Sequence, residues 1–442
     1  MFAKNKSKTA AIERGTERSL LIGIDIGTSW LRLIAGTVDA DGAVTVRFYR
    51  EVKSSGMNAG SVSDLFALSD ALTLLMQDVE PKLGHALDHC LLGIAGRHIE
   101  SRNEHGTATV QNRIVSRVDR DHCIENARSV KLTEGNHIIH VIPQFYTCDN
   151  GSEIINPIGL SAMRVEVQVH IISCSRDQEN NLRSAIQRVS SDVMIDRFVF
   201  TGIAAADAVL SLDDKNIGVC LIDYGAGTVN VAVYDRQRLI ISFGLERGGN
   251  AITRAIALRY GLPLSLAEEI KCKYGAASST LLSESDRKMS LQVSVGGADG
   301  QDEKVFISKA DLADVIASGL QDVFNAVSDQ IEHCSRDMGI VLNLGAGFVL
   351  TGGVAKTRSI EKLATLALSP NGYDLVKVKV GNPRGVTWCD DSPVGPDKAV
   401  SVGLLRFGRS DLDDRLQGEQ GAQQEKGSSL WAKIKEWFHK EL

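Results

Sequence analysis

Two segments far apart in the chain repeat nearly the same pattern, and this repetition constrains the fold more than any other feature of the sequence. One spans residues 22–36 and the other residues 219–233. Each has an apolar strand, a sharp Asp-x-Gly turn with small hydroxyl residues, and a second strand in which apolar and polar residues alternate. A single Asp-Gly turn is common and carries little weight. Two copies, each opening a domain-sized stretch, make a pair of related ligand sites the better interpretation.

The residue types in the two turns are suited to holding phosphate. Glycine lets the backbone approach an anion closely and point N–H groups at it, and hydroxyl side chains add donors. The glycines and hydroxyl residues of the two turns are Gly27, Thr28, Ser29, Gly225, Gly227 and Thr228. Asp25 and Asp223 would repel bare phosphate, so the sequence predicts a divalent cation between these carboxylates and the phosphate.

Composition indicates a globular protein whose main partner is not nucleic acid. The 442 residues are enough for two to four structural units, and 43% hydrophobic residues can bury sizeable cores. The formal net charge of -6, without a long basic block, argues against nucleic acid. Eight cysteines without a C-x-x-C pair indicate reduced thiols in a cytoplasmic protein. No apolar run reaches about 18 residues, so neither secretion nor a membrane span is expected.

Hydrophobic periodicity predicts alternating helices and strands with an interruption in the first half of the chain. Helices are expected at 64–76, 120–131, 179–190, 251–260, 309–338 and from about 359. Strands are expected at 91–96, 137–143 and 163–172, and the main fold is expected to resume with a strand at 169–173. The mixed region between residues 96 and 170 looks like an inserted domain, whereas 276–305 is expected to hold turns and short strands.

A third segment, residues 347–356, joins a buried strand to the start of a helix through two adjacent glycines. Gly352 and Gly353 permit the close approach of the backbone to a flat ligand. The segment is therefore a third candidate for contact with a bound ligand.

The C-terminal residues differ in character from the body of the chain. Residues 409–427 are rich in charged residues and glutamine and predict a flexible linker, and 428–442 predict a short amphipathic helix. The apolar stripe of this helix consists of Leu430, Trp431, Ile434, Trp437 and Phe438, and the rest of its surface includes Lys433, Lys435, Glu436 and Lys440. Such a helix can dock on the body of the protein, but the linker and the tryptophan-rich stripe favour attachment to membrane lipids, anionic ones included.

The paired turns, followed by a strand, two glycines and a helix, resemble the actin-like ATPase superfamily, which includes actin, MreB, DnaK-type chaperones and sugar kinases. Within it, residues 140–146, 156–161 and 165–172 are similar to the insertion of the FtsA family of bacterial division proteins. That family also ends in a linker and an amphipathic helix. The resemblance covers nearly the whole chain from Leu20 to Leu442, so the chain is identified as a member of this family.

The resemblance implies an α/β fold with two actin-like lobes, built on a ribonuclease H-like duplicated core, and an inserted α+β domain in the first lobe. ATP and Mg²⁺ are expected in the cleft between the lobes. The implied parts are a flexible N-terminus (1–18), the first-lobe core (19–84, completed by 169–210 and 395–408), the insertion (85–168), the second-lobe core (211–249, completed by 321–394), the small subdomain of the second lobe (250–320), the linker (409–427) and the terminal helix (428–442).

The same resemblance assigns roles to individual residues. The first phosphate loop would comprise Asp25, Gly27, Thr28 and Ser29, and the second Asp223, Gly225, Gly227 and Thr228. Asp25 and Asp223 would also face the Mg²⁺, and Gly352 and Gly353 would flank the adenosine. The run 267–271 is similar to the superfamily's A-E-x-x-K element, so Glu268 and Lys271 would hold the ribose or base, although a solvated helix face has the same spacing.

One departure from the superfamily concerns hydrolysis. MreB and the chaperones carry a Glu-Pro pair before a run of alanines, which helps to place the attacking water, whereas this chain has Thr201 and Gly202 before three alanines. A neutral threonine cannot act as a general base. We therefore expect slow hydrolysis, with ATP serving as a switch that closes the lobes and favours polymerisation.

The resemblance implies an adaptor of cell division. Such a protein would polymerise at the inner face of the cytoplasmic membrane at the division site, bind the C-terminal peptide of the tubulin homologue FtsZ, and help to recruit later division proteins. The peptide would bind at about 250–320, and the insertion would contact neighbouring protomers. Two alternatives share parts of the pattern: a PilM-like scaffold of pilus assembly, against which the terminal helix argues, and a sugar kinase, which would need a carboxylate base beside a substrate hydroxyl.

Overall fold

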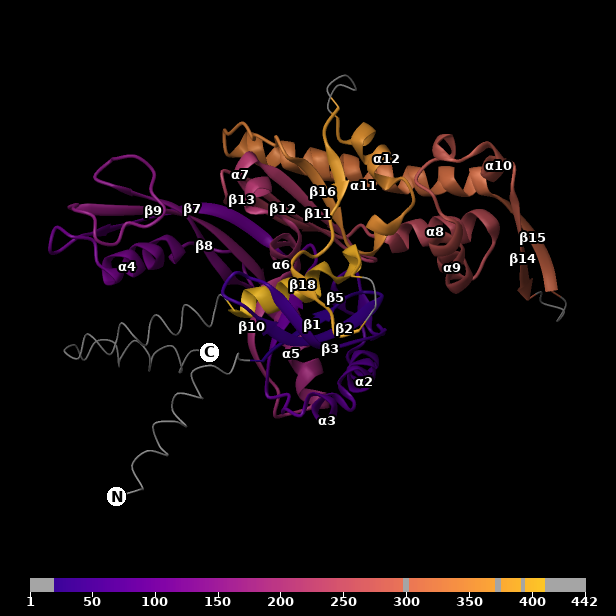
Figure 1. Ribbon diagram of the computed structural model, residues 1–442, viewed down its shortest axis with the longest axis horizontal. Helices are drawn as coiled ribbons and strands as arrows, with labels where there is room; N and C mark the ends of the chain where they lie inside the picture. The colour runs from indigo at the N-terminus through magenta and orange to yellow at the C-terminus, as the bar shows by residue number, and fades with distance from the viewer. Residues whose placement is uncertain (1–19, 297–301, 370–374, 391–393, 410–442) are drawn as a thin grey trace.

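The computed structural model describes residues 20–296, 302–369, 375–390 and 394–409 (Figure 1). Two α/β lobes, each with its own sheet, lie one above the other in this view, and a third, smaller sheet projects to the left (Figure 1). The predictions for 1–18 and 428–442 lie outside the described residues, as does the linker at 409–427 apart from Arg409. Among the described helices, none combines the length and the hydropathy needed to cross a membrane.

The sheet of the first lobe has six strands in the order β10-β6-β1-β2-β3-β18. Its strands are β1 (Leu21–Ile26), β2 (Trp30–Val38), β3 (Val44–Lys53), β6 (His89–Ile94), β10 (Met194–Phe200) and β18 (Val386–Thr387). The first predicted turn joins β1 to β2, which pair antiparallel with Asp25 opposite Arg32. β6 pairs in parallel with β1 and with β10. β1 and β6 are buried along most of their length, as expected of central strands covered by helices.

Several helices pack against the sheet of the first lobe. α2 (Leu65–Met76), α3 (Val79–Leu83) and α5 (Arg176–Val189) lie together at the bottom of Figure 1. α2 begins after Asp64, whose carboxylate accepts the N–H groups of the second and third helical residues at 3.0 Å each. Residues 399–409 form a helix that packs on β1, where a Cβ on Gly23 would lie 2.9 Å from Leu404. α6 (Thr201–Val209), which follows β10, is almost wholly buried.

The second lobe repeats the central arrangement of the first. Its five-stranded sheet has the order β13-β12-β11-β16-β17. The strands are β11 (Val219–Tyr224), β12 (Val229–Asp235), β13 (Arg238–Leu245), β16 (Gly347–Thr351) and β17 (Val378–Val380). The second predicted turn joins β11 to β12, with Asp223 opposite Asn230, and β16 pairs in parallel with β11 as β6 does with β1. The duplicated α/β core is therefore confirmed.

The rest of the second lobe is mainly helical. Its longer elements are α8 (Gly249–Tyr260), α9 (Leu264–Tyr274), the hairpin of β14 (Ser290–Gly296) and β15 (Asp302–Ser308), and α11 (Lys309–Asp337). The short elements of the whole chain are β4 (Met57–Asn58), β5 (Ser61–Val62), α7 (Leu212–Ile217), η1 (Ser279–Leu281), α10 (Glu284–Arg287), η2 (Gly353–Lys356), α12 (Ile360–Ala367) and η3 (Pro396–Lys398). α11 turns an apolar stripe into the core of this lobe, as its periodicity predicts.

The smaller sheet belongs to the insert. The insert comprises β7 (Glu100–Thr109), α4 (Arg117–Arg128), β8 (Asn136–Cys148) and β9 (Arg164–Ser175). Its three strands are antiparallel in the order β7-β9-β8. α4 lies directly on β7, because a Cβ on Gly106 would be 2.6 Å from Ala127 N. The insert has its own hydrophobic core.

Three predicted boundaries differ from the structure. The insertion expected at 85–168 would include β6, which instead lies inside the sheet of the first lobe. The strand expected at 169–173, as the return of the main fold, is the end of β9 and continues its pairing with β7. β18 lies in the range 321–394 expected for the second lobe but pairs with β3 of the first. Periodicity shows that a strand exists, but the partner of the strand depends on contacts distant in sequence.

Candidate functional site

The two predicted turns face each other where the lobes meet. In each turn a glycine N–H donates to the carbonyl three residues later, at 3.1 Å in the first turn and 2.9 Å in the second. A Cβ on Gly227 would overlap the side chain of Thr28, so the second turn touches the first and needs glycine at this position. The structure thus brings together two turns that the sequence identifies separately.

Asp25 and Asp223 lie near the ends of β1 and β11, with only 7% and 6% of their surfaces exposed. Burial, and then the neighbouring charge of Asp25, raises the pKa of Asp223 to about 7. Burial also raises the pKa of Asp25, although Arg32 opposes this effect. Within the described residues, Asp223 accepts a 3.4 Å hydrogen bond from Asn230 but forms no ion pair. Of the two buried carboxylates, only Asp25 has a cationic partner among the described residues, so the negative charge of the pair is only partly neutralised.

The surroundings of these aspartates fit a bound divalent cation. Carboxylate oxygens are ligands that Mg²⁺ prefers, and a cation between them would supply the missing charge. Thr201 Oγ1 and Asn230 Oδ1 are buried and have no hydrogen-bond partner among the described residues. Native proteins usually satisfy such atoms with water or a ligand. The residues therefore fit the ATP and Mg²⁺ that the resemblance implies.

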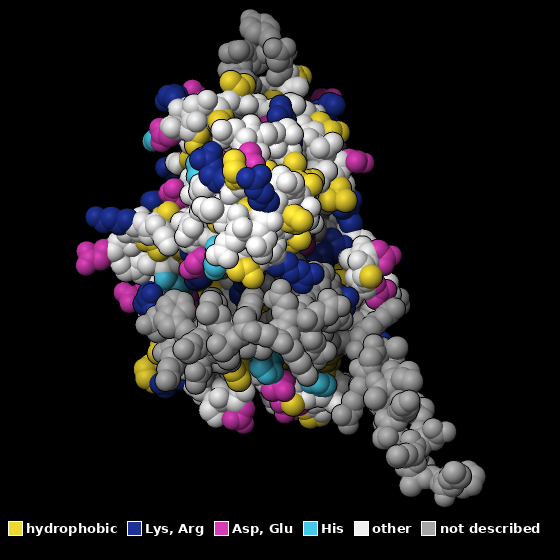
Figure 2. Space-filling model, turned by 90° about the vertical axis from the view of Figure 1, so that its left-hand side faces the viewer, with side chains coloured by type: hydrophobic (Ala, Val, Ile, Leu, Met, Phe, Trp, Pro, Cys, Tyr) yellow, Lys and Arg dark blue, Asp and Glu magenta, His cyan; other side chains and the backbone are white. Residues whose placement is uncertain are grey.

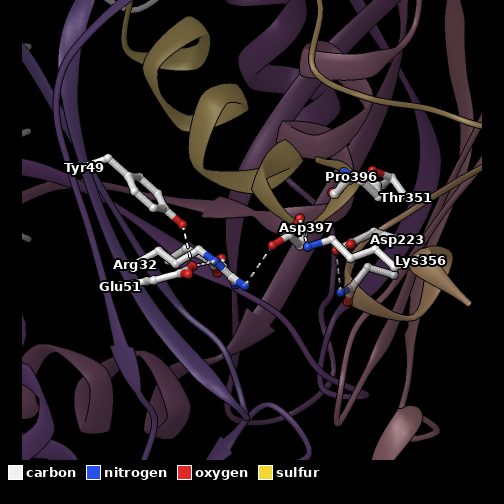
Figure 3. A network of polar contacts seen from close by, with 10 residues as sticks. Arg32, Tyr49, Glu51, Asp223, Thr351, Lys356, Pro396 and Asp397 are labelled. Atoms are coloured by element: carbon white, nitrogen blue, oxygen red, sulfur yellow. Dashed lines mark hydrogen bonds and ion pairs between the residues drawn. The ribbon is translucent and has the colours of Figure 1, made fainter. Parts of the chain in front are cut away.

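A network of charges that the sequence analysis missed lies beside the aspartates (Figure 3). The guanidinium of Arg32 contacts three carboxylates, which belong to Asp25 at 3.6 Å, Glu51 at 3.3 Å and Asp397 at 3.9 Å. The ammonium of Lys356 lies 2.6 Å from Asp397. Hairpin register could have identified Arg32, since it lies opposite Asp25. No local pattern signals Asp397, which comes from a distant part of the chain.

The two glycines after β16 differ in their surroundings. Gly352 has a φ of 86°, and a Cβ on it would lie 2.6 Å from Tyr224 O and 2.7 Å from Asp223 Oδ1. Only glycine fits this position without strain. Around Gly353, no atom of the described residues lies within 4 Å of the Cβ position. The open side of Gly353 is where a flat ligand can approach the backbone.

Glu268 and Lys271 lie on α9 and contact the start of α8. Lys271 Nζ is 2.6 Å from Glu268 Oε2, and it donates to Gly249 O at 3.0 Å and to Thr253 Oγ1 at 2.7 Å. Gly249 N–H in turn donates to Gly225 O of the second turn at 3.1 Å. Burial raises the pKa of Glu268, but the hydrogen bond and charge of Lys271, together with bonds from Thr253 and Cys272, outweigh it and the net shift is downward. The pair is thus anchored beside the second turn, unlike a plain solvated helix face.

Thr201 begins α6 and is buried next to Asp25. A Cβ on Gly93 would lie 3.2 Å from Thr201 Cγ2 and 3.7 Å from Asp25 Oδ1, which places the two side chains on the same side of β6. Thr201, where the resemblance to MreB would imply a glutamate, therefore adjoins the carboxylate pair. The chain supplies a hydroxyl there, which cannot act as a general base.

His137, Cys174 and Glu179 form another group of potential metal ligands among the described residues. The Cys174 sulfur lies 4.0 Å from Nδ1 of His137, whereas Glu179 contacts Nε2 on the other side of the ring. The candidate ligand atoms of the three residues lie within 4.8 Å of one another. Burial raises the pKa of Cys174 to about 12, so the thiol stays protonated. We assign these residues to the packing of β8 and β9 on α5.

The chain matches two family models, described as "SHS2 domain inserted in FTSA" at residues 96–173 and "Cell division protein FtsA" at residues 220–403. It is 31% identical to the cell division protein FtsA of Escherichia coli K12 over 436 residues, which cover 97% of this chain and 100% of that protein. It is 30% identical to FtsA of Neisseria meningitidis serogroup B, with 94% of this chain and 97% of that protein covered.

Solved structures of other families share the architecture. The PilM-PilN type IV pilus biogenesis complex has a TM-score of 0.60 at 16% identity and covers 88% of this chain and 99% of its own. MreB 5 of Spiroplasma citri bound to AMPPNP has a TM-score of 0.54 at 13% identity and covers 91% and 99%. At such identities the likeness shows the fold alone, and it confirms the two actin-like lobes. The division proteins match at higher identity over nearly their whole length, and the chain belongs to the FtsA family of cell division proteins.

Proposed function

We propose that this protein is an ATP-binding adaptor that polymerises at the inner face of the cytoplasmic membrane and anchors FtsZ there during division. The observation that carries the proposal is the pair of facing turns with two buried carboxylates, in a chain that belongs to a family of division proteins. The turns would hold the phosphates, Asp25 and Asp223 would hold Mg²⁺, and Gly353 would lie against the adenosine. A titration with fluorescent ATP, with and without Mg²⁺, tests the nucleotide part, and Mg²⁺-independent affinity would contradict it.

Binding of ATP, and not its hydrolysis, would control polymerisation. Thr201 provides no base for the attacking water, so hydrolysis should be much slower than nucleotide binding and exchange. Non-hydrolysable analogues should therefore support polymerisation about as well as ATP does. Sedimentation of filaments formed with each nucleotide tests this expectation, and a strict requirement for hydrolysis would refute it.

A groove between α8 and α11 is the proposed site of the FtsZ peptide. The groove has a volume of about 700 Å³ and combines an apolar floor, which includes Ile252 and Val323, with charged residues at its rim. Ser318 lines the groove and is exposed, so Ser318→Trp should fill it and weaken binding of the peptide at least tenfold. Asn325→Trp, on the same helix outside the groove lining, is the matched control. Fluorescence anisotropy with a labelled peptide compares them.

The far end of the insert is proposed to contact other protomers and later division proteins. In Figure 2, which faces this side of the molecule, hydrophobic side chains lie among Lys and Arg side chains. The exposed large hydrophobic residues described in the insert are Ile114, Val118, Ile155, Leu160 and Met163. Ile155 is 85% exposed, so Ile155→Lys should reduce filament formation without changing nucleotide affinity. Equal sedimentation of this variant and the wild type would exclude the face as a polymer contact.

The terminal stripe is proposed as the membrane anchor. It consists of Leu430, Trp431, Ile434, Trp437 and Phe438. Burial contributes at most roughly 1.5–3 kcal/mol for each side chain, and ordering a short helix offsets much of this, so one tail binds weakly and a filament with many tails binds firmly. Trp431→Glu or Trp437→Glu should release the protein from liposomes while ATP binding persists, and Lys435→Ala should have a smaller effect. If both Trp→Glu variants sediment with liposomes as the wild type does, the tail docks on the body of the protein.

A further inference from the structure

Asp397 links the two lobes through opposite sides of its carboxylate (Figure 3). One oxygen lies 2.6 Å from Lys356 Nζ of the second lobe, and the other lies 3.9 Å from Nη2 of Arg32 in the first. We propose that Asp397 is a positioning residue, which holds Arg32 while the nucleotide site is empty and releases it when phosphate binds. This inference rests on the proposed nucleotide site.

The segment that carries Asp397, residues 394–398, is attached to both lobes. On one side, Pro396 O accepts hydrogen bonds from Thr351 Oγ1 at 2.9 Å and from Gly352 N–H at 3.1 Å. On the other side, the chain continues directly into the helix at 399–409, which packs on β1 of the first lobe. The segment therefore joins the strand and glycine pair of the second lobe to the core of the first. A change in the contacts of Asp397 acts at this junction.

Arg32 is placed to exchange one carboxylate for phosphate. Its side chain is only 12% exposed, and it lies opposite Asp25, next to the first turn. The distances of 3.6 Å to Asp25 and 3.9 Å to Asp397 are longer than the roughly 2.7–2.9 Å of a strong charge-assisted bond. A terminal phosphate group held by the turns carries up to about two negative charges, whereas each carboxylate carries one. Arg32 then contacts the phosphate in place of Asp397, and Asp397 retains only its ion pair with Lys356.

The competition has a measurable consequence. Asp397→Asn keeps the size of the side chain but removes the charge that competes with phosphate for Arg32. The variant should therefore bind ATP with Mg²⁺ about three- to tenfold more tightly than the wild type. Without nucleotide, it should also exchange the backbone hydrogens of 394–398 faster, because the link between the lobes is weaker. Asp397→Glu keeps the charge and should restore the wild-type behaviour in both measurements.

The experiment compares the full-length wild type, Asp397→Asn, Asp397→Glu and a matched control, Asp213→Asn, which removes a carboxylate from the exposed surface of α7. Fluorescent ATP gives the affinities, and hydrogen exchange by mass spectrometry gives the nucleotide-free dynamics. Tighter binding and faster exchange in Asp397→Asn alone support the inference. Unchanged or weaker binding in Asp397→Asn overturns it while leaving the nucleotide site intact. Failure of the wild type itself to bind ATP overturns the proposed function, and this inference with it.

Discussion

The Asp223 side chain is suited to binding a cation, but it lowers the stability of the nucleotide-free protein. Its carboxylate is buried, lies near Asp25 and, in the part of the chain that the structure describes, accepts only a long bond from Asn230. The pKa is raised from 3.8 to about 7, so the folded protein keeps a proton that the unfolded chain releases above pH 4. Stability is therefore lost as the pH rises from about 4 to 7, and the deficit is complete above pH 7.

Asp223→Asn removes this buried charge. At pH 8 and without nucleotide, we expect the variant to unfold at a higher temperature than the wild type, with a gain of about 2–4 kcal/mol in the free energy of unfolding. The same variant should lose the stabilisation that Mg²⁺ and ATP confer, because a cation ligand is missing. Thermal denaturation with and without Mg²⁺ and ATP tests both effects. A lower midpoint for the nucleotide-free variant at pH 8 would show that the carboxylate is stabilising.

Two buried histidines predict how stability responds to acid. His140 and His170 are each 1% exposed, and burial lowers the pKa of both to about 3. His140 Nε2 accepts a bond from Phe200 N–H, which a proton on this nitrogen would break, and burial disfavours a charge on either ring. The folded pKa lies below the ordinary value of 6.5, so this stability is present above about pH 6.5 and is lost as the pH falls towards 3.

The loss should reach about 2 kcal/mol for each histidine at pH 5. Chemical denaturation of the wild type and of His170→Gln, at pH 8 and at pH 5, measures it. The variant should be less stable at pH 8 but should lose less stability on acidification, because one of the two titrating rings is gone. Identical losses in the two proteins would exclude His170 as a source of the acid sensitivity.

At the scale of elements, local patterns predict what each segment forms but not which strands pair. The two turns, α2 and α11 follow from periodicity and cap residues that lie within a few positions of one another. The expected domain bounds placed β6 in the insert and the end of β9 in the first lobe, because an apolar run has the same appearance in either sheet. Asp397 reaches Arg32 only after the chain has folded, so no spacing in the sequence could have predicted their contact.

The glycines after β16 offer a matched pair of substitutions. Gly352→Ala introduces a Cβ against Tyr224 O at a φ of 86°, so it should destabilise the protein by about 2–4 kcal/mol. Gly353→Ala introduces a Cβ into open space and should leave the nucleotide-free protein as stable as the wild type. If adenosine lies over this glycine, the second variant should bind ATP at least tenfold more weakly. Thermal denaturation and ATP titration separate the two effects, and wild-type affinity in Gly353→Ala would place the nucleotide elsewhere.

At the scale of the whole molecule, the insert connects the lobes in an unexpected way. The segments before and after the insert belong to the first lobe. The strands of the insert nevertheless contact β13, the edge strand of the second sheet. Asn103 Nδ2 donates to Ile240 O at 3.1 Å, Gln144 Nε2 donates to Leu239 O at 2.5 Å, and Ser101 Oγ donates to Ser242 O at 2.6 Å. Side chains of the insert thus satisfy three backbone carbonyl groups of β13. Any movement of one lobe relative to the other must carry the insert with it or break these bonds.

Asn103 is the centre of this network, because its Oδ1 also lies 2.7 Å from His170 Nδ1 and accepts a 3.1 Å bond from Gln144. Asn103→Ala should destabilise the protein by about 2–4 kcal/mol, since it leaves several buried polar groups without partners. The control is Asn126→Ala, which removes one exposed bond from α4 to β7 inside the insert. In scanning calorimetry, Asn103→Ala should separate the unfolding of the insert from that of the second lobe, whereas the control should shift the whole transition slightly. A single cooperative transition in both variants would mean that the core of the insert, and not its bonds to β13, couples it to the lobes. Two transitions in Asn103→Ala alone would mean that these side-chain bonds couple the unfolding of the insert to that of the second lobe.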